Sequence, residues 1–128
     1  MELSDIVNIL ECKSHTGREL LRRDVQYCYA ADMMSDVLKS CKIGSLLITG
    51  LINKQVTQVA EIMDLKGIIF ASGKLPAQDV IEEANEKNLP LLTTEKPLFE
   101  ACGILYTLGL RGKEICEKAD DGTGDSLQ

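Results

Sequence analysis

Apolar residues along the chain follow two patterns, one typical of amphipathic helices and one typical of strands buried on both faces. Residues 45–49 (SLLIT) and 67–72 (GIIFAS) are nearly continuous apolar runs, as in parallel strands at the centre of a sheet. Between the two runs, apolar residues recur at helical spacing, at Val56, Val59, Ala60 and Met63. This order predicts a parallel βαβ unit over residues 44–73, with a right-handed crossover.

The same alternation continues toward the C-terminus. Helical periodicity over residues 76–88 and 97–109 predicts two further helices, with proline in the first turn of each. Asn88 and Gly109 are expected to end them. Between the helices, residues 89–93 (LPLLT) predict a third parallel strand. Pro90 places that strand at a sheet edge or leaves only its first residues unpaired.

The N-terminal third is less regular. We expect a helix that starts near Asp5 with Ser4 as its cap, and then a short strand or turn at residues 13–16. Gly17 is predicted to adopt a positive φ after that segment. Alternating residues 24–31 predict a strand with at least one buried face.

Two glycines and one aspartate are expected to mark helix ends. Asp32 stands where an N-cap belongs, ahead of an amphipathic helix that contains Met34, Val37, Leu38 and Cys41. Gly44 is predicted to end this helix, and Gly67 to end the helix of the central unit. Together these elements predict an α/β fold with a mostly parallel sheet.

The length of 128 residues indicates one domain, which we place at residues 1–112. Residues 113–128 are expected to form a polar tail without fixed structure, because residues 117–128 hold four acids, one lysine and two glycines.

The balance of charge is acidic, with 14 Lys+Arg against 20 Asp+Glu, so a nucleic-acid surface is not expected. No apolar run approaches the ~18 residues of a membrane span. The N-terminus MELSDIVNILE lacks the basic region of a secretion signal. Five cysteines without a C-x-x-C pair suggest neither a metal site nor a redox motif, and buried thiols in the cytoplasm are the favoured interpretation.

No catalytic pattern stands out. His15 is the only histidine, and its spacing to the cysteines indicates no Cys–His pair. Neither G-x-x-x-x-G-K-[ST] nor G-x-G-x-x-G occurs. Favourable interactions with a helix dipole explain Asp32 and Asp36 without a metal. We therefore expect a protein that is not an enzyme and needs no cofactor.

Small polar residues gather where the predicted parallel strands end. In open α/β sheets, ligands bind beyond the carboxyl ends of the strands, next to free helix N–H groups. The candidate ligand-binding residues are Thr49, Gly50, Asn53, Ser72, Gly73, Lys74, Thr93 and Thr94. Whether these residues bind a ligand or only form turns remains open, because strand-to-helix turns use the same residue types without a ligand.

Nearly the whole chain, from Leu3 to about Gly112, resembles the DRTGG domain family. The resemblance rests on the segments MELSDIVNILECKSHTG, AADMMSDVL, LLITGLINKQVTQVAEIMDLKGIIFASG and NLPLLTTEKPLFEACGILYTLGL. Candidates for the residues in the family name are Asp32, Thr49, Gly67 and Gly73, and no arginine can be assigned beyond the pair Arg22–Arg23.

The resemblance implies a three-layer α/β/α fold, similar to the N-terminal domain of bifunctional HPr kinase/phosphorylases. It also implies a regulatory or assembly module without catalysis, as such domains occur beside CBS domains. From the family's habits we expect a homodimer, an adenine nucleotide as a candidate ligand, and a hydrogenase or another enzyme of energy metabolism as a candidate partner. A protein-interaction scaffold without a ligand is the alternative.

Overall fold

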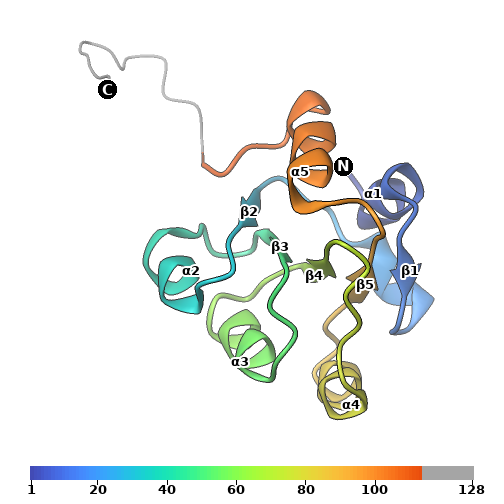
Figure 1. The fold of residues 1–128 in the computed structure, drawn as a ribbon, viewed down its shortest axis with the longest axis vertical. Helices are drawn as coiled ribbons and strands as arrows, with labels where there is room; N and C mark the ends of the chain where they lie inside the picture. The colour runs from blue at the N-terminus through green and yellow to red at the C-terminus, as the bar shows by residue number, and fades with distance from the viewer. Residues whose placement is uncertain (114–128) are drawn as a thin grey trace.

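The computed structural model describes residues 1–113, which form a five-stranded sheet between two layers of helices (Figure 1). The strand order is β1-β5-β4-β3-β2, with β1 antiparallel to β5 and all other pairs parallel. Along the chain the elements are α1 (Leu3–Leu10), β1 (Lys13–Ser14), the 3-10 helix η1 (Arg18–Arg22), β2 (Cys28–Ala30), α2 (Met34–Ser40), β3 (Leu46–Thr49), α3 (Gln55–Ile62), β4 (Gly67–Phe70), α4 (Gln78–Glu86), β5 (Leu91–Thr93) and α5 (Leu98–Thr107).

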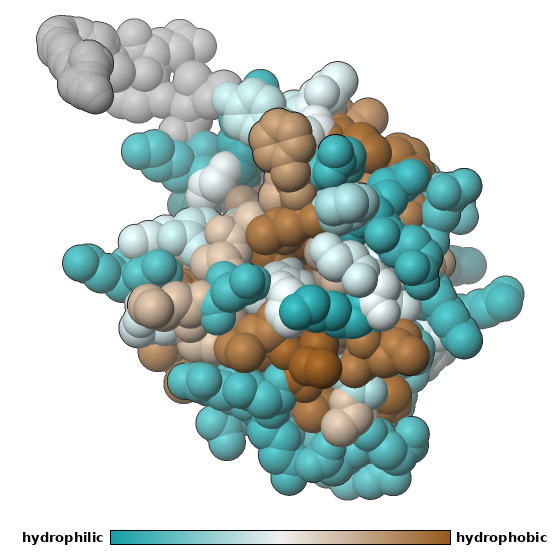
Figure 2. Space-filling model, viewed as in Figure 1, coloured by the Kyte–Doolittle hydropathy of each residue, from teal (hydrophilic) through white to brown (hydrophobic). Residues whose placement is uncertain are grey.

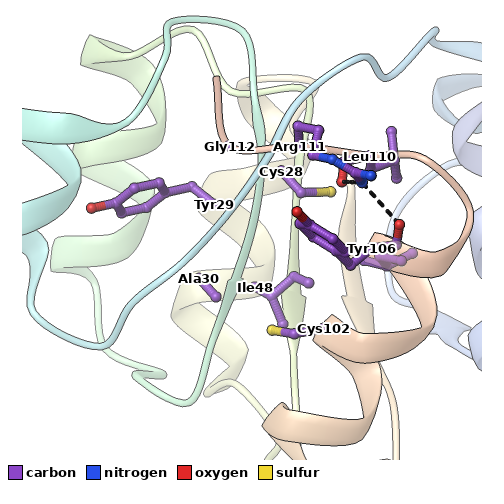
Figure 3. Close-up of a pocket in the computed structure, with 10 residues that line it drawn as sticks. Cys28, Tyr29, Ala30, Ile48, Cys102, Tyr106, Leu110, Arg111 and Gly112 are labelled. Atoms are coloured by element: carbon purple, nitrogen blue, oxygen red, sulfur yellow. Dashed lines mark hydrogen bonds between the residues drawn. The ribbon is translucent and has the colours of Figure 1, made fainter. Parts of the chain in front are cut away.

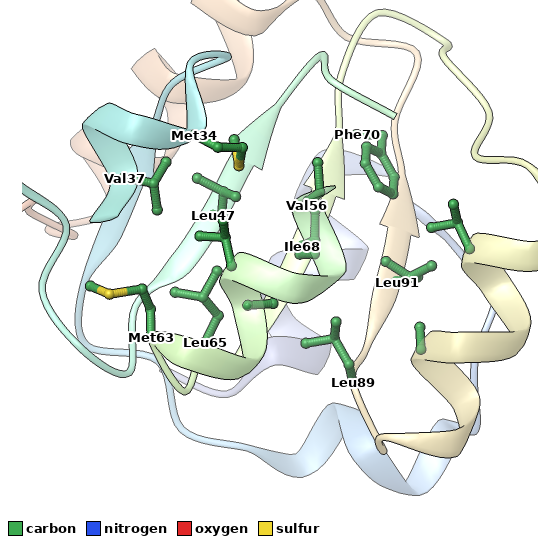
Figure 4. Packing of buried hydrophobic residues seen from close by; sticks show 14 of the residues in the cluster. Met34, Val37, Leu47, Val56, Met63, Leu65, Ile68, Phe70, Leu89 and Leu91 are labelled. Carbon is green, nitrogen blue, oxygen red and sulfur yellow. The ribbon is translucent and has the colours of Figure 1, made fainter. Parts of the chain in front are cut away.

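Helices cover both faces of the sheet, which confirms the predicted three-layer α/β/α architecture. Helices α2, α3 and α4 lie on one side, and α1 and α5 lie on the other (Figure 1). Successive strand residues point to opposite faces, so Leu47 packs with the first group and Leu46 with the second. Because both faces are covered, β3, β4 and β5 are buried at every position. Figure 4 shows the first core, where Leu47, Ile68 and Leu91 meet the three helices.

The central βαβ unit is present, but glycines play other parts in it than predicted. Helix α3 ends at Ile62, and Asp64 with φ of 50° takes the left-handed position after it. Gly67 is therefore not a helix end. It opens β4, where a Cβ would lie 3.3 Å from the side chain of Pro90, so the residue allows close packing. Gly44 has a positive φ of 84°, but α2 already ends at Ser40.

Other local predictions at the N-terminal end were wrong. Helix α1 follows Glu2 at its cap position, and the Ser4 hydroxyl donates to Glu2 Oε1 instead of capping the helix. Gly17 has a φ of −61°, which any residue can adopt. The strand predicted over residues 24–31 is limited to Cys28–Ala30. Of the short strand or turn predicted at residues 13–16, the structure shows a strand, β1, at Lys13–Ser14.

The prolines also sit slightly outside their predicted places. Helix α4 begins at Gln78, two residues after Pro76, and Pro97 is the cap residue of α5. Strand β5 lies between β1 and β4, so it is not at an edge, and Pro90 precedes its first residue. Asn88 and Gly109 have positive φ values after α4 and α5, as expected of residues that end helices.

The predicted tail, apart from Lys113, lies outside the described residues. In residues 1–113, no helix has the length and apolar character that crossing a membrane would need.

Candidate functional site

The predicted site residues come from three neighbouring strands that end at the same edge of the sheet. The parallel register aligns Thr49 of β3 with Phe70 of β4, and Phe70 with Thr93 of β5. Neighbouring strands are ~4.8 Å apart, so the ends of β3 and β5 are about 10 Å from each other. The loops that follow them therefore form one continuous surface, the carboxyl edge, to which the end of β2 also contributes.

At the end of β3, an acidic side chain from the neighbouring β2–α2 loop is hydrogen-bonded to the backbone. The Oδ1 atom of Asp32 accepts hydrogen bonds from the Gly50 N–H at 2.7 Å and the Thr49 hydroxyl at 3.2 Å. Asp32 is thus not the N-cap of α2. Met33 has that position, without a side-chain cap. Asp32 lies in the loop after β2, just as Gly50 lies in the loop after β3, so the strand-end rule also points to Asp32, which our candidate set omitted.

Gly50 keeps the space above Asp32 open. A Cβ on Gly50 would lie 3.5 Å from Asp32 Oδ1 and 3.8 Å from Lys74 Cδ. Asp32 and Lys74 therefore approach the same backbone position from two loops, and both side chains are exposed. No ion pair joins them within the described part of the chain.

At the end of β4, a tight turn is fixed to the next loop. Ser72 and Gly73 have φ values of 62° and 71°, the left-handed region that serine rarely adopts. Their N–H groups donate to the carbonyls of Lys96 and Thr94, both at 2.9 Å. Ser72 is exposed on this turn, whose backbone is hydrogen-bonded to the β5–α5 loop.

At the end of β5, the two threonine hydroxyls serve the fold. Thr94 is 2% exposed, and its hydroxyl donates to the Leu10 carbonyl at 2.8 Å. The Thr93 hydroxyl lies 3.0 Å from His15 Nε2. Burial, together with the charge of Lys13, lowers the pKa of His15, which favours the neutral form of the ring. These threonines hold β1, α1 and the β5–α5 loop in place.

The remaining candidates lie on the rim of the carboxyl edge. Asn53 is exposed, and its Oδ1 accepts from the Gln55 N–H at 3.0 Å, in the turn just before α3. Lys96, by contrast, has its amine 3.5 Å from Glu11 Oε1. The structure thus brings Thr49, Gly50 and Lys74 together around Asp32, and joins Ser72 and Gly73 to the β5–α5 loop.

The electrostatics of this edge do not favour a simple anion. The backbone N–H groups of Gly50, Ser72 and Gly73 already donate within the protein. Asp32 also brings negative charge next to Lys74. The same surface carries apolar groups, including Leu75, which is 64% exposed, and the partly exposed Leu51. Figure 2 shows such mixed apolar and polar surface. This arrangement suits a ligand with apolar, hydroxyl and anionic parts.

A separate cavity of about 120 Å³ lies between β2 and α5. Ile48, Leu105 and Leu110 give it apolar walls, and the thiols of Cys28 and Cys102 contribute to its lining (Figure 3). At its rim, the guanidinium carbon of Arg111 lies 3.7 Å from the centre of the Tyr106 ring. Figure 3 shows Tyr29 pointing away from this cavity.

A polar hollow of about 260 Å³ lies between the C-terminal ends of α3 and α4. The Lys87 amine there lies 2.8 Å from Glu61 Oε1 and 3.1 Å from Glu83 Oε2. Hydrogen bonds from the Thr57 hydroxyl and from Lys87 lower the pKa of Glu83. Since these charges pair with one another, the hollow offers little to a charged ligand.

Within residues 1–113, no group of three or more His, Cys, Asp or Glu side chains is arranged to hold a metal ion. The four cysteines in that range, Cys12, Cys28, Cys41 and Cys102, are free thiols.

Comparison with known proteins gives a family and a fold. The family model described as DRTGG domain matches residues 5–108. The structure is similar to the crystal structure of the CBS and DRTGG domains of the regulatory region of Clostridium perfringens pyrophosphatase, complexed with its activator diadenosine tetraphosphate. The TM-score is 0.70 at 19% identity, over 81% of this chain and 45% of that chain. At this identity the likeness shows the fold alone, and this chain spans less than half the length of that chain. No curated protein matches the chain.

Proposed function

The chain belongs to the DRTGG domain family, and from that premise we propose that it is a regulatory domain without a reaction of its own, which binds an adenine nucleotide at the carboxyl edge. The structural neighbour supports the regulatory role, because it is the regulatory region of a pyrophosphatase in complex with diadenosine tetraphosphate. That neighbour contains CBS and DRTGG domains together, so its activator supports the class of ligand and not its place. The place rests on the geometry of this chain.

The observation that carries the placement is the carboxylate of Asp32 beside Gly50. Its Oδ1 is held by the Gly50 N–H and the Thr49 hydroxyl, which fixes the orientation of the side chain. Its Oδ2 accepts no hydrogen bond from residues 1–113, so it can accept hydrogen bonds from the two hydroxyls of a ribose. An acidic residue at a strand end has this role in dinucleotide-binding α/β folds. Gly50 lets the sugar approach the backbone closely.

The other parts of a nucleotide have partners on the same edge. Lys74 supplies positive charge for a phosphate, with the exposed Ser72 hydroxyl and Asn53 amide as further hydrogen-bond donors. Leu51 and Leu75 offer apolar surface to the base. In this proposal Gly73, Thr93 and Thr94 act indirectly, because their hydrogen bonds and backbone geometry hold the loops in place.

Thermal denaturation of the full chain with ATP, AMP and diadenosine tetraphosphate tests the proposal. A ligand that binds only the native state raises its stability, by about 2.7 kcal/mol at a concentration of 100 times Kd. The Lys74→Ala variant should show a smaller shift in Tm. The matched control Lys39→Ala removes an exposed lysine from the last turn of α2 and should keep the full shift. No shift with any nucleotide at millimolar concentration would contradict the binding proposal.

A second candidate function, a protein-interaction module, is favoured by the outer face of α5. Phe99 is 83% exposed and Tyr106 is 61% exposed, while the space outside Gly103 is empty within 4 Å. Glu100 is the only charged residue of this helix. An apolar outer face of this kind is typical of a helix that another surface covers.

We propose a second copy of the chain as the occupant of this face, in a homodimer, with a hydrogenase or another enzyme of energy metabolism as the alternative. Light scattering during gel filtration measures the mass directly. The wild type should elute as a dimer of 14.1 kDa chains, and Phe99→Ser should shift it toward monomer. A wild type that is monomeric at all concentrations would exclude the homodimer and leave the enzyme partner.

A further inference from the structure

The cavity between β2 and α5 has an apolar interior and a fixed cation at its mouth. Its volume of about 120 Å³ is slightly smaller than that of an engineered apolar cavity, of about 150 Å³, that stays dry and binds benzene. Ile48 and Leu105 form part of its wall and belong to the core of that face of the sheet. A small apolar group therefore fits this space better than an ion or a sugar does.

The two thiols do not change this apolar character. Burial, with a smaller contribution from Cys102, raises the pKa of the Cys28 thiol to about 12. Burial also raises the pKa of Cys102. Both groups are accordingly protonated at neutral pH, and a protonated buried thiol behaves as a small hydrophobic group. They line the cavity without making it a nucleophilic or metal-binding site.

Arg111 is held in place at the rim by three contacts. Its Nη1 donates to the carbonyls of Tyr106 and Leu110, both at 2.9 Å, and its guanidinium lies over the Tyr106 ring. Figure 3 shows the guanidinium next to the cavity, with the dashed hydrogen bond to Tyr106. The contacts use Nη1, so the edge formed by Nε and Nη2 remains for a partner. That edge matches the two oxygens of a carboxylate.

No acidic side chain among residues 1–113 forms an ion pair with Arg111. The structure thus presents an arginine that lines an apolar cavity and whose position is fixed by neutral groups. Holding a guanidinium in one orientation before binding reduces the entropy that a ligand must offset.

We propose that this cavity is a second binding site, separate from the carboxyl edge, for a small apolar carboxylate such as a short branched or aromatic acid. The hydrocarbon body occupies the space between Ile48, Leu105 and the two thiols. The carboxylate accepts two parallel hydrogen bonds from Nε and Nη2 of Arg111. For a regulatory domain, such a site would provide an input that is independent of a nucleotide.

Titration of the full chain with benzoate and isobutyrate tests this site, with amide NMR signals of Cys28 and Gly112 as the readout. We expect saturable shifts with a Kd on the order of 1 mM, as suits ligands of so few atoms. Benzyl alcohol has a similar hydrocarbon body without the charge and should bind at least about tenfold more weakly than benzoate. Shifts confined to other parts of the protein, or equal binding of the alcohol, would overturn the proposal.

Variants separate the roles of cation and cavity. Arg111→Gln and Arg111→Lys, which both lose the planar fork, should each weaken benzoate binding about tenfold or more. The control Arg22→Gln changes an exposed arginine of η1 and should leave Kd unchanged. Cys102→Leu, which fills part of the cavity, should weaken benzoate binding even with Arg111 intact. Unchanged affinity in both Arg111 variants, each shown to be folded by its Tm, would refute the site.

Discussion

Replacing Thr94 by valine removes one hydroxyl from the loop after β5 while keeping the shape of the side chain. That hydroxyl donates to the Leu10 carbonyl at 2.8 Å and accepts from the Lys96 N–H at 3.2 Å. The side chain is 2% exposed, so water cannot replace the lost partner of the Leu10 carbonyl. An unsatisfied buried group costs about 1–3 kcal/mol, and the Lys96 N–H, which is half-buried, adds less. We expect a loss of about 2–3 kcal/mol in the free energy of unfolding.

Urea denaturation measures this loss. With a slope of about 1–3 kcal/mol per M, the midpoint of Thr94→Val should fall by about 0.7–3 M without a change in slope. Thr107→Val is the matched control, because its exposed hydroxyl donates to the Gly103 carbonyl within the same helix. That control should stay within about 0.5 kcal/mol of the wild type. Equal midpoints for the two variants would refute the structural role given to Thr94.

Two further predictions concern backbone strain and pH. Gly73→Ala should destabilise the protein by about 1–2 kcal/mol, because its φ is 71° and the new Cβ would lie 2.8 Å from Glu95 Oε1. Gly103→Ala, in open space within α5, should stabilise it by about 0.5–1 kcal/mol. Thermal denaturation compares the two variants, and similar Tm changes of the same sign would contradict this account. The lowered pKa of His15 means that the unfolded chain binds a proton more readily than the folded one, so stability should fall as pH drops from 7 toward 5. In urea denaturation at several pH values, His15→Gln should reduce this loss of stability. An unchanged pH profile would show that His15 does not contribute to it.

The central part of the fold could be predicted from the sequence because its signals are local. The runs at residues 45–49 and 67–72 are apolar at nearly every position, which only strands covered on both faces require. Gly67 was misassigned because a glycine after a helix looks the same whether it supplies a positive φ or a close approach. Glycine is favoured at this position because a Cβ would lie 3.3 Å from the side chain of Pro90, a residue 23 positions away in the chain.

The candidate site was predictable as an edge, but not as a set of contacts. Strand ends can be located from the apolar runs, and the parallel register then brings Thr49 and Thr93 to one edge. Which hydroxyls remain available depends on partners distant in sequence. The Thr94 hydroxyl binds the Leu10 carbonyl 84 residues away, and Asp32 binds Gly50 across 18 residues. Local propensity contains no information about such pairs, so Asp32 was predicted to be a helix cap.

The most direct test of the nucleotide site is calorimetric titration of the full chain with ATP and with its 2′,3′-dideoxy analogue, in the wild type and in Asp32→Asn. If the Asp32 carboxylate binds the ribose hydroxyls, the wild type should bind ATP about tenfold more tightly than the analogue. Asp32→Asn should lose that preference, and Asp36→Asn, which changes an exposed acid in the first turn of α2, should keep it. Equal affinity of the wild type for both nucleotides would contradict the role of Asp32, and no binding of either would contradict the nucleotide site itself.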